Sequence, residues 1–178
     1  MKKIISLFER DFSGNRQVYD VVSDGALWVT EGEGVATQKY DGTCCLIKGG
    51  VFYKRYTLRR RKTAPDDFIP ATTVDPVTGK QEGWVLVKPG DKWHNEAFVD
   101  TMQDGTYELC GPKVQGNPEG YSKHLLVSHA LAREIPDCPR SFDELKEFLK
   151  HQDIEGIVWH HPDGRMVKIK KSDFGLGR

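Results

Sequence analysis

Lys39 stands in a stretch whose composition predicts a buried β-strand. The residues GVATQKY contain it, and the turn-forming pair Asp41-Gly42 follows. A buried ammonium group is unfavourable unless it pairs with an opposite charge or gives up its proton. An amine that has lost its proton is a nucleophile. The position of Lys39 therefore predicts either a paired ammonium or a reactive amine.

The segment near the end of the sequence predicts a surface that holds charges of both signs. Lys168 and Lys170 are two residues apart, so their side chains share one face of a strand. Val167 and Ile169 then point to the other face, into the core. Glu155, from the strand before, projects from the lysine face. One carboxylate and two ammonium groups are expected on one surface, although ordinary solvent-exposed charges would give the same pattern.

The pairing of these two strands depends on the turn between them. Asp163-Gly164 is a favoured pair for a two-residue hairpin turn. With that turn, Trp159 lies opposite Lys168 and Ile157 lies opposite Lys170. With this register, Glu155 projects from the same face as the two lysines.

A second hairpin is predicted around Gly49-Gly50, between TCCLIK and VFYKRYTL. Pairing across this turn sets Cys44 opposite Arg55. The hairpin therefore returns Arg55 to within a few residues of Lys39. Glu108 stands in the middle of another short strand, TYELCG, where an acid is either an edge residue or a functional one.

The remaining elements predict the fold class. EGWVLVK and HLLVSHA read as strands, residues 62–80 as a long loop, and SFDELKEFLKH as the clearest helix. Ser141 and Glu144 have the spacing of a capping box. The helix has an apolar stripe of Phe142, Leu145, Phe148 and Leu149. Many short strands with one or two helices, and no βαβ rhythm, favour an α+β fold with antiparallel sheets.

Composition narrows the class of protein. The 178 residues fit one domain, 1–178, and 38% apolar residues suffice for a core. Lysine plus arginine equals aspartate plus glutamate, 26 each, so overall charge indicates no polyanionic partner. The four cysteines lack zinc-ligand spacing, and without a signal peptide they predict reduced thiols in the cytoplasm. No apolar run could span a membrane, and no obligate protein partner is evident.

In order along the sequence, these residues resemble the motifs of the covalent nucleotidyltransferases, which include RNA ligases, DNA ligases and mRNA capping enzymes. KYDG matches the lysine motif K-x-D-G, EGIVW and VKIK match two later motifs, and YELCGPKVQ resembles a fourth region. The surrounding segments QKYDGTCC, GWVLV, GNPEGYSKHLLVSHA and IEGIVWHHPDG resemble the vertebrate-type RNA ligase 1 family. The resemblance covers roughly residues 35–176. It implies a ligase-type nucleotidyltransferase domain, ATP-grasp-like, in which antiparallel sheets with flanking helices surround a nucleotide cleft.

The resemblance also implies an activity. Members of that family use ATP to join RNA 5′-phosphate and 3′-hydroxyl ends. Lys39 would form the lysyl-AMP phosphoramidate, for which it must be a neutral amine. Positive charge from Lys168, Lys170, Arg55 and a divalent metal would lower its proton affinity. This makes the reactive amine the expected state of Lys39.

The other roles implied by the resemblance concern the bound nucleotide and the RNA. Glu155 would hold Mg²⁺ or Mn²⁺, and Lys168 and Lys170 would contact the α-phosphate. Arg55 and Glu108 would hold the ribose, and Gln38 would approach the adenine edge. The basic run KRYTLRRRK suggests three RNA phosphate contacts, Arg59, Arg60 and Arg61. HLLVSHA has no aromatic residue to stack on adenine, which leaves Val127, a histidine or a residue elsewhere.

Two alternatives remain. The protein could be a nucleotidyltransferase with another acceptor, either a DNA nick ligase or a GTP-using capping enzyme. The sequence has no OB-fold domain after the last motif, which argues against both. It could also be a non-catalytic RNA-binding module with the same fold. The intact set of Lys39, Glu155 and Lys168 argues against that reading.

Overall fold

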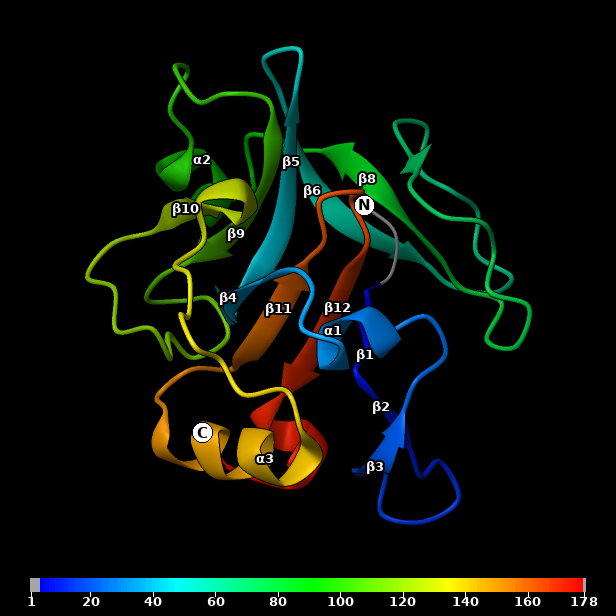
Figure 1. Ribbon diagram of the computed structural model, residues 1–178. Coiled ribbons are helices and arrows are strands. Elements are labelled where there is room, and N and C mark those ends of the chain that lie inside the picture. The colour runs from blue at the N-terminus through cyan, green and yellow to red at the C-terminus, as the bar shows by residue number, and fades with distance from the viewer. Residues whose placement is uncertain (1–3, 178) are drawn as a thin grey trace. The chain divides into compact units, whose positions relative to one another are not determined.

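The computed structural model describes residues 4–177 and has an α+β architecture with antiparallel strand pairs, as predicted (Figure 1). Two compact units divide this part of the chain. The central unit comprises Asp41–Leu131, and the terminal unit comprises residues 4–40 with 132–177. The nucleotidyltransferase fold and the single domain 1–178 stay predictions.

The central unit is built on a six-stranded antiparallel sheet. Its strands follow the order β10-β9-β5-β6-β8-β7. Their bounds are β5 (Thr43–Lys48), β6 (Val51–Leu58), β7 (Ile69–Pro70), β8 (Gln81–Leu86), β9 (Gly105–Cys110) and β10 (Leu125–Ser128). The helix α2 (Lys92–Ala97) and the 3-10 turn η1 (His129–Leu131) complete the unit. One face of the sheet is apolar and forms a core that includes Cys45, Ile47, Phe52, Tyr107, Leu109 and Leu126.

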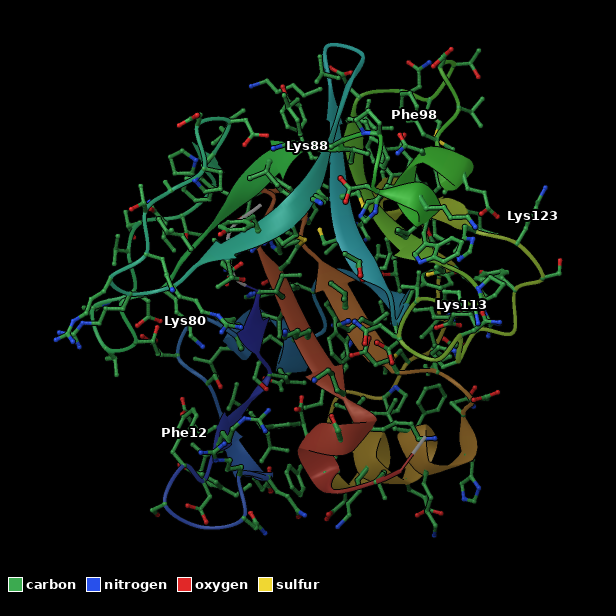
Figure 2. The ribbon with its side chains drawn as sticks, turned by 180° about the vertical axis from the view of Figure 1, so that it is seen from behind. Phe12, Lys80, Lys88, Phe98, Lys113 and Lys123 are labelled. Atoms are coloured by element: carbon green, nitrogen blue, oxygen red, sulfur yellow. The ribbon has the colours of Figure 1, made fainter. Side chains whose placement is uncertain are left out.

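The terminal unit is built on a four-stranded sheet with the order β1-β12-β11-β4. Its strands are β1 (Ile5–Ser6), β4 (Val35–Lys39), β11 (Gly156–His160) and β12 (Met166–Lys170), and β1 pairs with β12 in parallel. A separate hairpin joins β2 (Phe8–Arg10) to β3 (Val18–Val22). At the tip of that hairpin, Phe12 is exposed (Figure 2). The unit also contains α1 (Leu27–Thr30), α3 (Phe142–His151) and the 3-10 turn η2 (Lys171–Phe174).

Helix α3 confirms the predicted apolar stripe. Leu145 and Leu149 are fully buried in the core of the terminal unit, and Phe142 and Phe148 pack against that core. The predicted capping box is wrong, because neither side chain bonds to a backbone amide of the first turn. The Ser141 hydroxyl instead donates to the Glu144 carboxylate at 2.6 Å.

The last hairpin forms, but its predicted register is wrong by one residue. Val158 lies opposite Lys168 and Trp159 opposite Val167. The loop holds three residues between His161 and Arg165, whose backbones are hydrogen-bonded. Gly164 closes this loop at a φ of 88°, the left-handed geometry of three-residue hairpins. As a result, Ile157 and Trp159 point into the core and leave the lysine face.

The hairpin at Gly49-Gly50 has the predicted register, with Cys45 opposite Lys54. The predicted loop at residues 62–80 contains the two-residue strand β7, and the predicted strand HLLVSHA ends at Ser128, where η1 begins. The sequence did not predict α1 or α2, since helices of four and six residues are too short for a hydrophobic period.

All four cysteines are free thiols, as predicted. Within residues 4–177, no helix has the length and apolar character needed to cross a bilayer.

Gly156 occupies a crowded position in the terminal sheet. It pairs with Lys170 on one side and with Lys39 on the other. A Cβ atom at this position would lie 2.2 Å from the Ile169 carbonyl oxygen and 2.8 Å from the Lys170 Cα atom. Both are backbone atoms, which cannot move aside without displacing β12.

We expect Gly156→Ala to lower the free energy of unfolding by about 3 kcal/mol or more, because overpacking against backbone forces the strands apart. Chemical denaturation measures this change. Gly177→Ala is the matched control, since a Cβ there meets no atom within 4 Å. Equal stability of the two variants would contradict the close packing of β11 against β12.

Candidate active site

The register of the terminal sheet brings Lys39, Lys168 and Lys170 to one face. Lys39 and Lys170 flank Gly156 from the two neighbouring strands. Lys168 lies two residues before Lys170 and faces the same way, opposite Val158. Because Gly156 has no side chain, β12 packs closely against β11 at this point.

Glu155, the residue before Gly156, brings a carboxylate to these lysines. The carboxylate forms an ion pair with the Lys39 ammonium, and its second oxygen lies 4.0 Å from the Lys170 ammonium. The Lys39 and Glu155 side chains are 22% and 18% exposed, so water screens the pair only in part. The Lys39 ammonium also donates to the Tyr40 carbonyl at 3.3 Å.

Glu155 supplies the opposite charge that a partly buried Lys39 can pair with. The predicted loss of the Lys39 proton stays a prediction. The predicted surface of one carboxylate and two ammonium groups is confirmed, and Lys39 joins it.

The pKa of Lys168 is lowered on this face. Burial lowers the pKa of its ammonium, and the neighbouring charges of Lys39 and Lys170 lower it further. The carboxylates of Asp173 and Glu155 act in the opposite direction and offset only part of the shift. The face is therefore electropositive and suited to a phosphate-bearing anion.

Asp173 anchors the end of β12 and was missed by sequence reasoning. The residue is 2% exposed, and its carboxylate pairs with Arg10 and accepts a hydrogen bond from the Lys170 amide at 2.9 Å. A partner 163 residues away gives no local pattern in the sequence. This contact fixes the backbone beside Lys170.

Gln38 is buried at 8% exposure and lies opposite Ile157. It therefore projects from the face opposite to Lys39, which argues against a side-chain contact with a nucleotide on the lysine face. Its predicted approach to adenine stays a prediction.

Arg55 and Glu108 belong to the central unit, and their role beside Lys39 stays a prediction. The register places Glu108 opposite Cys44, which alternates with the buried Cys45, and Arg55 alternates with Lys54, the residue opposite Cys45. Both residues thus share the sheet face that is turned away from the unit's core. Arg55 donates to Glu82 at 3.1 Å and stacks over the Trp84 ring.

The basic run ends in an exposed turn. Arg59, Arg60 and Arg61 follow β6 and are all exposed to solvent. Their exposure fits contact with a polyanion, although exposed basic residues are common on protein surfaces.

Comparison with known proteins gives matches to RNA ligase 1. The family model for RNA ligase 1 matches residues 94–178. RNA ligase 1 of Mus musculus is 25% identical, over 88% of this chain and 72% of its own length. RNA ligase 1 of Danio rerio is 33% identical, over 44% of this chain and 26% of its own length. The resemblance predicted from the motifs is therefore confirmed: the chain is similar to proteins named RNA ligase 1 over most of its length.

Proposed function

We propose that the protein is an ATP-dependent RNA ligase that works through a covalent lysyl-AMP at Lys39. The observation that supports this proposal is the arrangement around Gly156, where Lys39, Lys170 and Glu155 meet with Lys168 beside them. Its relatives named RNA ligase 1 support RNA as the substrate.

The reaction has three steps. The Lys39 amine attacks the α-phosphorus of ATP, a nitrogen–phosphorus bond forms, and pyrophosphate leaves. The RNA 5′-phosphate then takes AMP from the lysine as a 5′–5′ pyrophosphate. Finally the RNA 3′-hydroxyl attacks that activated phosphate and releases AMP. Lys168 and Lys170 stabilise the negative charge that develops on the α-phosphate oxygens.

Glu155 is the residue proposed to hold the metal ion, and it lies beside Lys39. A single carboxylate with nucleotide phosphates and water is a donor set that suits Mg²⁺ or Mn²⁺, which would screen the phosphate charge. Glu155 would hold such an ion, and Lys168 and Lys170 would lie beside the phosphates that Lys39 attacks.

The remaining nucleotide contacts follow from the resemblance. Arg55 and Glu108 are proposed to hold the ribose. Val127 lies opposite Glu108 on the same sheet face, which supports it as an apolar contact for the base. Gln38 is the least supported of these residues, because its side chain projects from the other face of β4.

The acceptor separates this proposal from its alternatives. Sealing assays compare single-stranded RNA, nicked RNA and nicked DNA, each with ATP or GTP. An RNA ligase seals RNA with ATP. Sealing of nicked DNA alone, or label transfer from GTP alone, would favour the other nucleotidyltransferases. RNA binding with no label on well-folded protein would indicate the non-catalytic module.

We expect Lys39→Ala to abolish covalent labelling by α-labelled ATP, because the variant has no amine to attack phosphorus. Label that survives denaturation and gel electrophoresis is the measurement. Lys146→Ala, a change at an exposed lysine of α3, is the control and should label like wild type. Full labelling of Lys39→Ala would refute the assignment of the nucleophile.

Lys168→Met should lower the rate of adenylylation about 10²–10³-fold, because the transition state loses one charged contact. The same change should stabilise the fold near pH 7. A lowered pKa means that the charged lysine opposes folding, and that this cost fades as pH rises toward the ordinary lysine pKa.

The stability difference between wild type and Lys168→Met should therefore narrow from about pH 7 to about pH 10. Urea denaturation across this range measures it, with Lys146→Met as the exposed control. A stability difference that widens as the pH rises would contradict the lowered pKa of Lys168.

Replacing Arg59, Arg60 and Arg61 together by Gln should weaken RNA binding and leave lysyl-AMP formation unchanged. Each lost phosphate contact should reduce the slope of log K against log salt by about 0.7, so the triple variant should lose up to about 2. Titration of labelled single-stranded RNA at several salt concentrations measures the slope. A variant with Lys146 and Lys150 changed to Gln is the control, and an equal effect there would deny these arginines a specific role.

A further inference from the structure

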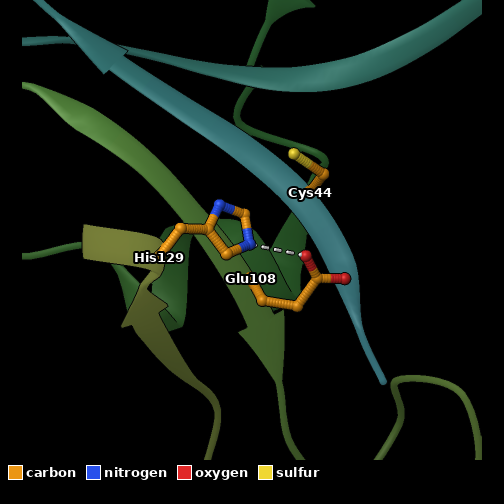
Figure 3. A group of neighbouring side chains, drawn as sticks. All are labelled: Cys44, Glu108 and His129. Atoms are coloured by element: carbon orange, nitrogen blue, oxygen red, sulfur yellow. Dashed lines mark hydrogen bonds and ion pairs between the residues drawn. The ribbon is translucent and has the colours of Figure 1, made fainter. Parts of the chain in front are cut away.

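Three potential metal ligands of the central unit converge on one face of its sheet. They are the Cys44 thiol, the Glu108 carboxylate and the His129 imidazole (Figure 3). One ligand atom from each lies within 4.8 Å of the other two. The mechanism proposed above uses neither Cys44 nor His129.

The sheet register explains why these residues meet. Cys44 on β5 lies directly opposite Glu108 on β9, so their side chains share a face. On the other side of β9, Ser128 of β10 lies opposite Tyr107, and His129 follows it at the start of η1. The three ligands therefore come from three separate segments that backbone pairing holds in place.

The histidine ring is already oriented. One ring nitrogen, Nε2, lies 3.0 Å from the Glu108 carboxylate, and the other, Nδ1, lies 3.0 Å from the Thr106 hydroxyl. Metal-binding histidines in proteins are held in this way by a hydrogen bond to the nitrogen that does not bind the metal. The Thr106 contact thus leaves Nε2 directed toward the carboxylate and any ion beside it.

We propose that Cys44, Glu108 and His129 bind a zinc ion. Thiolate, imidazole and carboxylate are the three protein ligand types of zinc, and three of them leave a fourth tetrahedral position for water or a substrate atom. The Glu108 side chain is 12% exposed and the His129 side chain 24% exposed, so the site is only partly open to water. The ion would take the place of the proton shared between Nε2 and the carboxylate, and the thiol would bind as thiolate after losing its proton.

The charge around the group is compatible with a cation. Binding adds two positive charges, and one thiolate with one carboxylate offsets both. Arg55 projects from the same sheet face and donates to the Glu82 carboxylate. That carboxylate compensates the positive charge of Arg55. The resemblance assigns Glu108 to the ribose, so the metal and the nucleotide would draw on the same carboxylate. Metal binding is therefore measured without nucleotide, which keeps it independent of the proposed ligase activity.

The test uses the full chain, stripped of metal and held in a reducing buffer. Zinc is titrated in competition with a chromogenic chelator, and cobalt serves as the spectroscopic probe because a thiolate–cobalt bond gives a charge-transfer band. Wild type should bind one zinc ion per chain and show the band. Cys44→Ser should lose the band, and Cys44→Ser and His129→Gln should each bind zinc at least about tenfold more weakly.

Two further variants separate the site from adventitious thiol binding. Thr106→Val leaves the three ligands intact but removes the bond that orients His129, and should weaken zinc binding about tenfold. Cys138→Ser removes a free thiol of the terminal unit and should bind like wild type. The proposal is overturned if wild type shows no thiolate–cobalt band, or if Cys44→Ser binds zinc as tightly as wild type. Thermal melting of each variant verifies that it is folded.

Discussion

One carboxylate placed among three ammonium groups is the interaction on which the terminal unit depends. Glu155 reaches Lys39 and Lys170 from the end of β11, and it also acts on Lys168. Without it the lysines would repel one another on a partly buried face, where charges are screened less than in water. Burial, together with the charges of Lys39 and Lys170, lowers the pKa of Lys168 even with Glu155 in place.

The backbone around Glu155 is what makes this concentration of charge possible. Gly156 removes a side chain from the middle of the row, and its close approach to the Ile169 carbonyl leaves no room to add one. The Lys171 amide donates to the Glu155 carbonyl at 2.9 Å, so the backbone of the acid is tied to the end of β12. Asp173 secures the same end of β12 through the Lys170 amide. One backbone–backbone hydrogen bond, one backbone-to-carboxylate bond and one glycine thus hold the backbone that carries these side chains.

The sequence predicted the parts of this site that depend on local pattern. Alternation along β12 was sufficient to put Lys168 and Lys170 on one face, with Val167 and Ile169 buried behind them. The local pattern could not predict the register across the hairpin, because Asp163-Gly164 fits a two-residue turn as well as the three-residue loop that forms. Because the loop is one residue longer than predicted, Val158 lies opposite Lys168 in place of Trp159.

Contacts between distant segments were also beyond local pattern. Ion pairs such as Arg10 with Asp173 join residues whose spacing along the sequence carries no period. The same holds for Cys44, Glu108 and His129. Their spacing matches no zinc motif, and only the pairing of β5, β9 and β10 brings them together. The position of His129 was also not predictable from the strand pattern HLLVSHA. That pattern continues past Ser128, where β10 ends, whereas His129 begins η1 and its ring contacts Glu108.

The position of Glu155 also bears on the proposed reaction. That reaction needs a Lys39 amine that can attack phosphorus, whereas in the structure Lys39 is in contact with the Glu155 carboxylate. A metal ion that arrived with the nucleotide phosphates would compete with Lys39 for this carboxylate. The proposal therefore links the freeing of Lys39 to substrate binding through one acid with two possible partners. Lys168 and Lys170, on the same face, would then receive the phosphate.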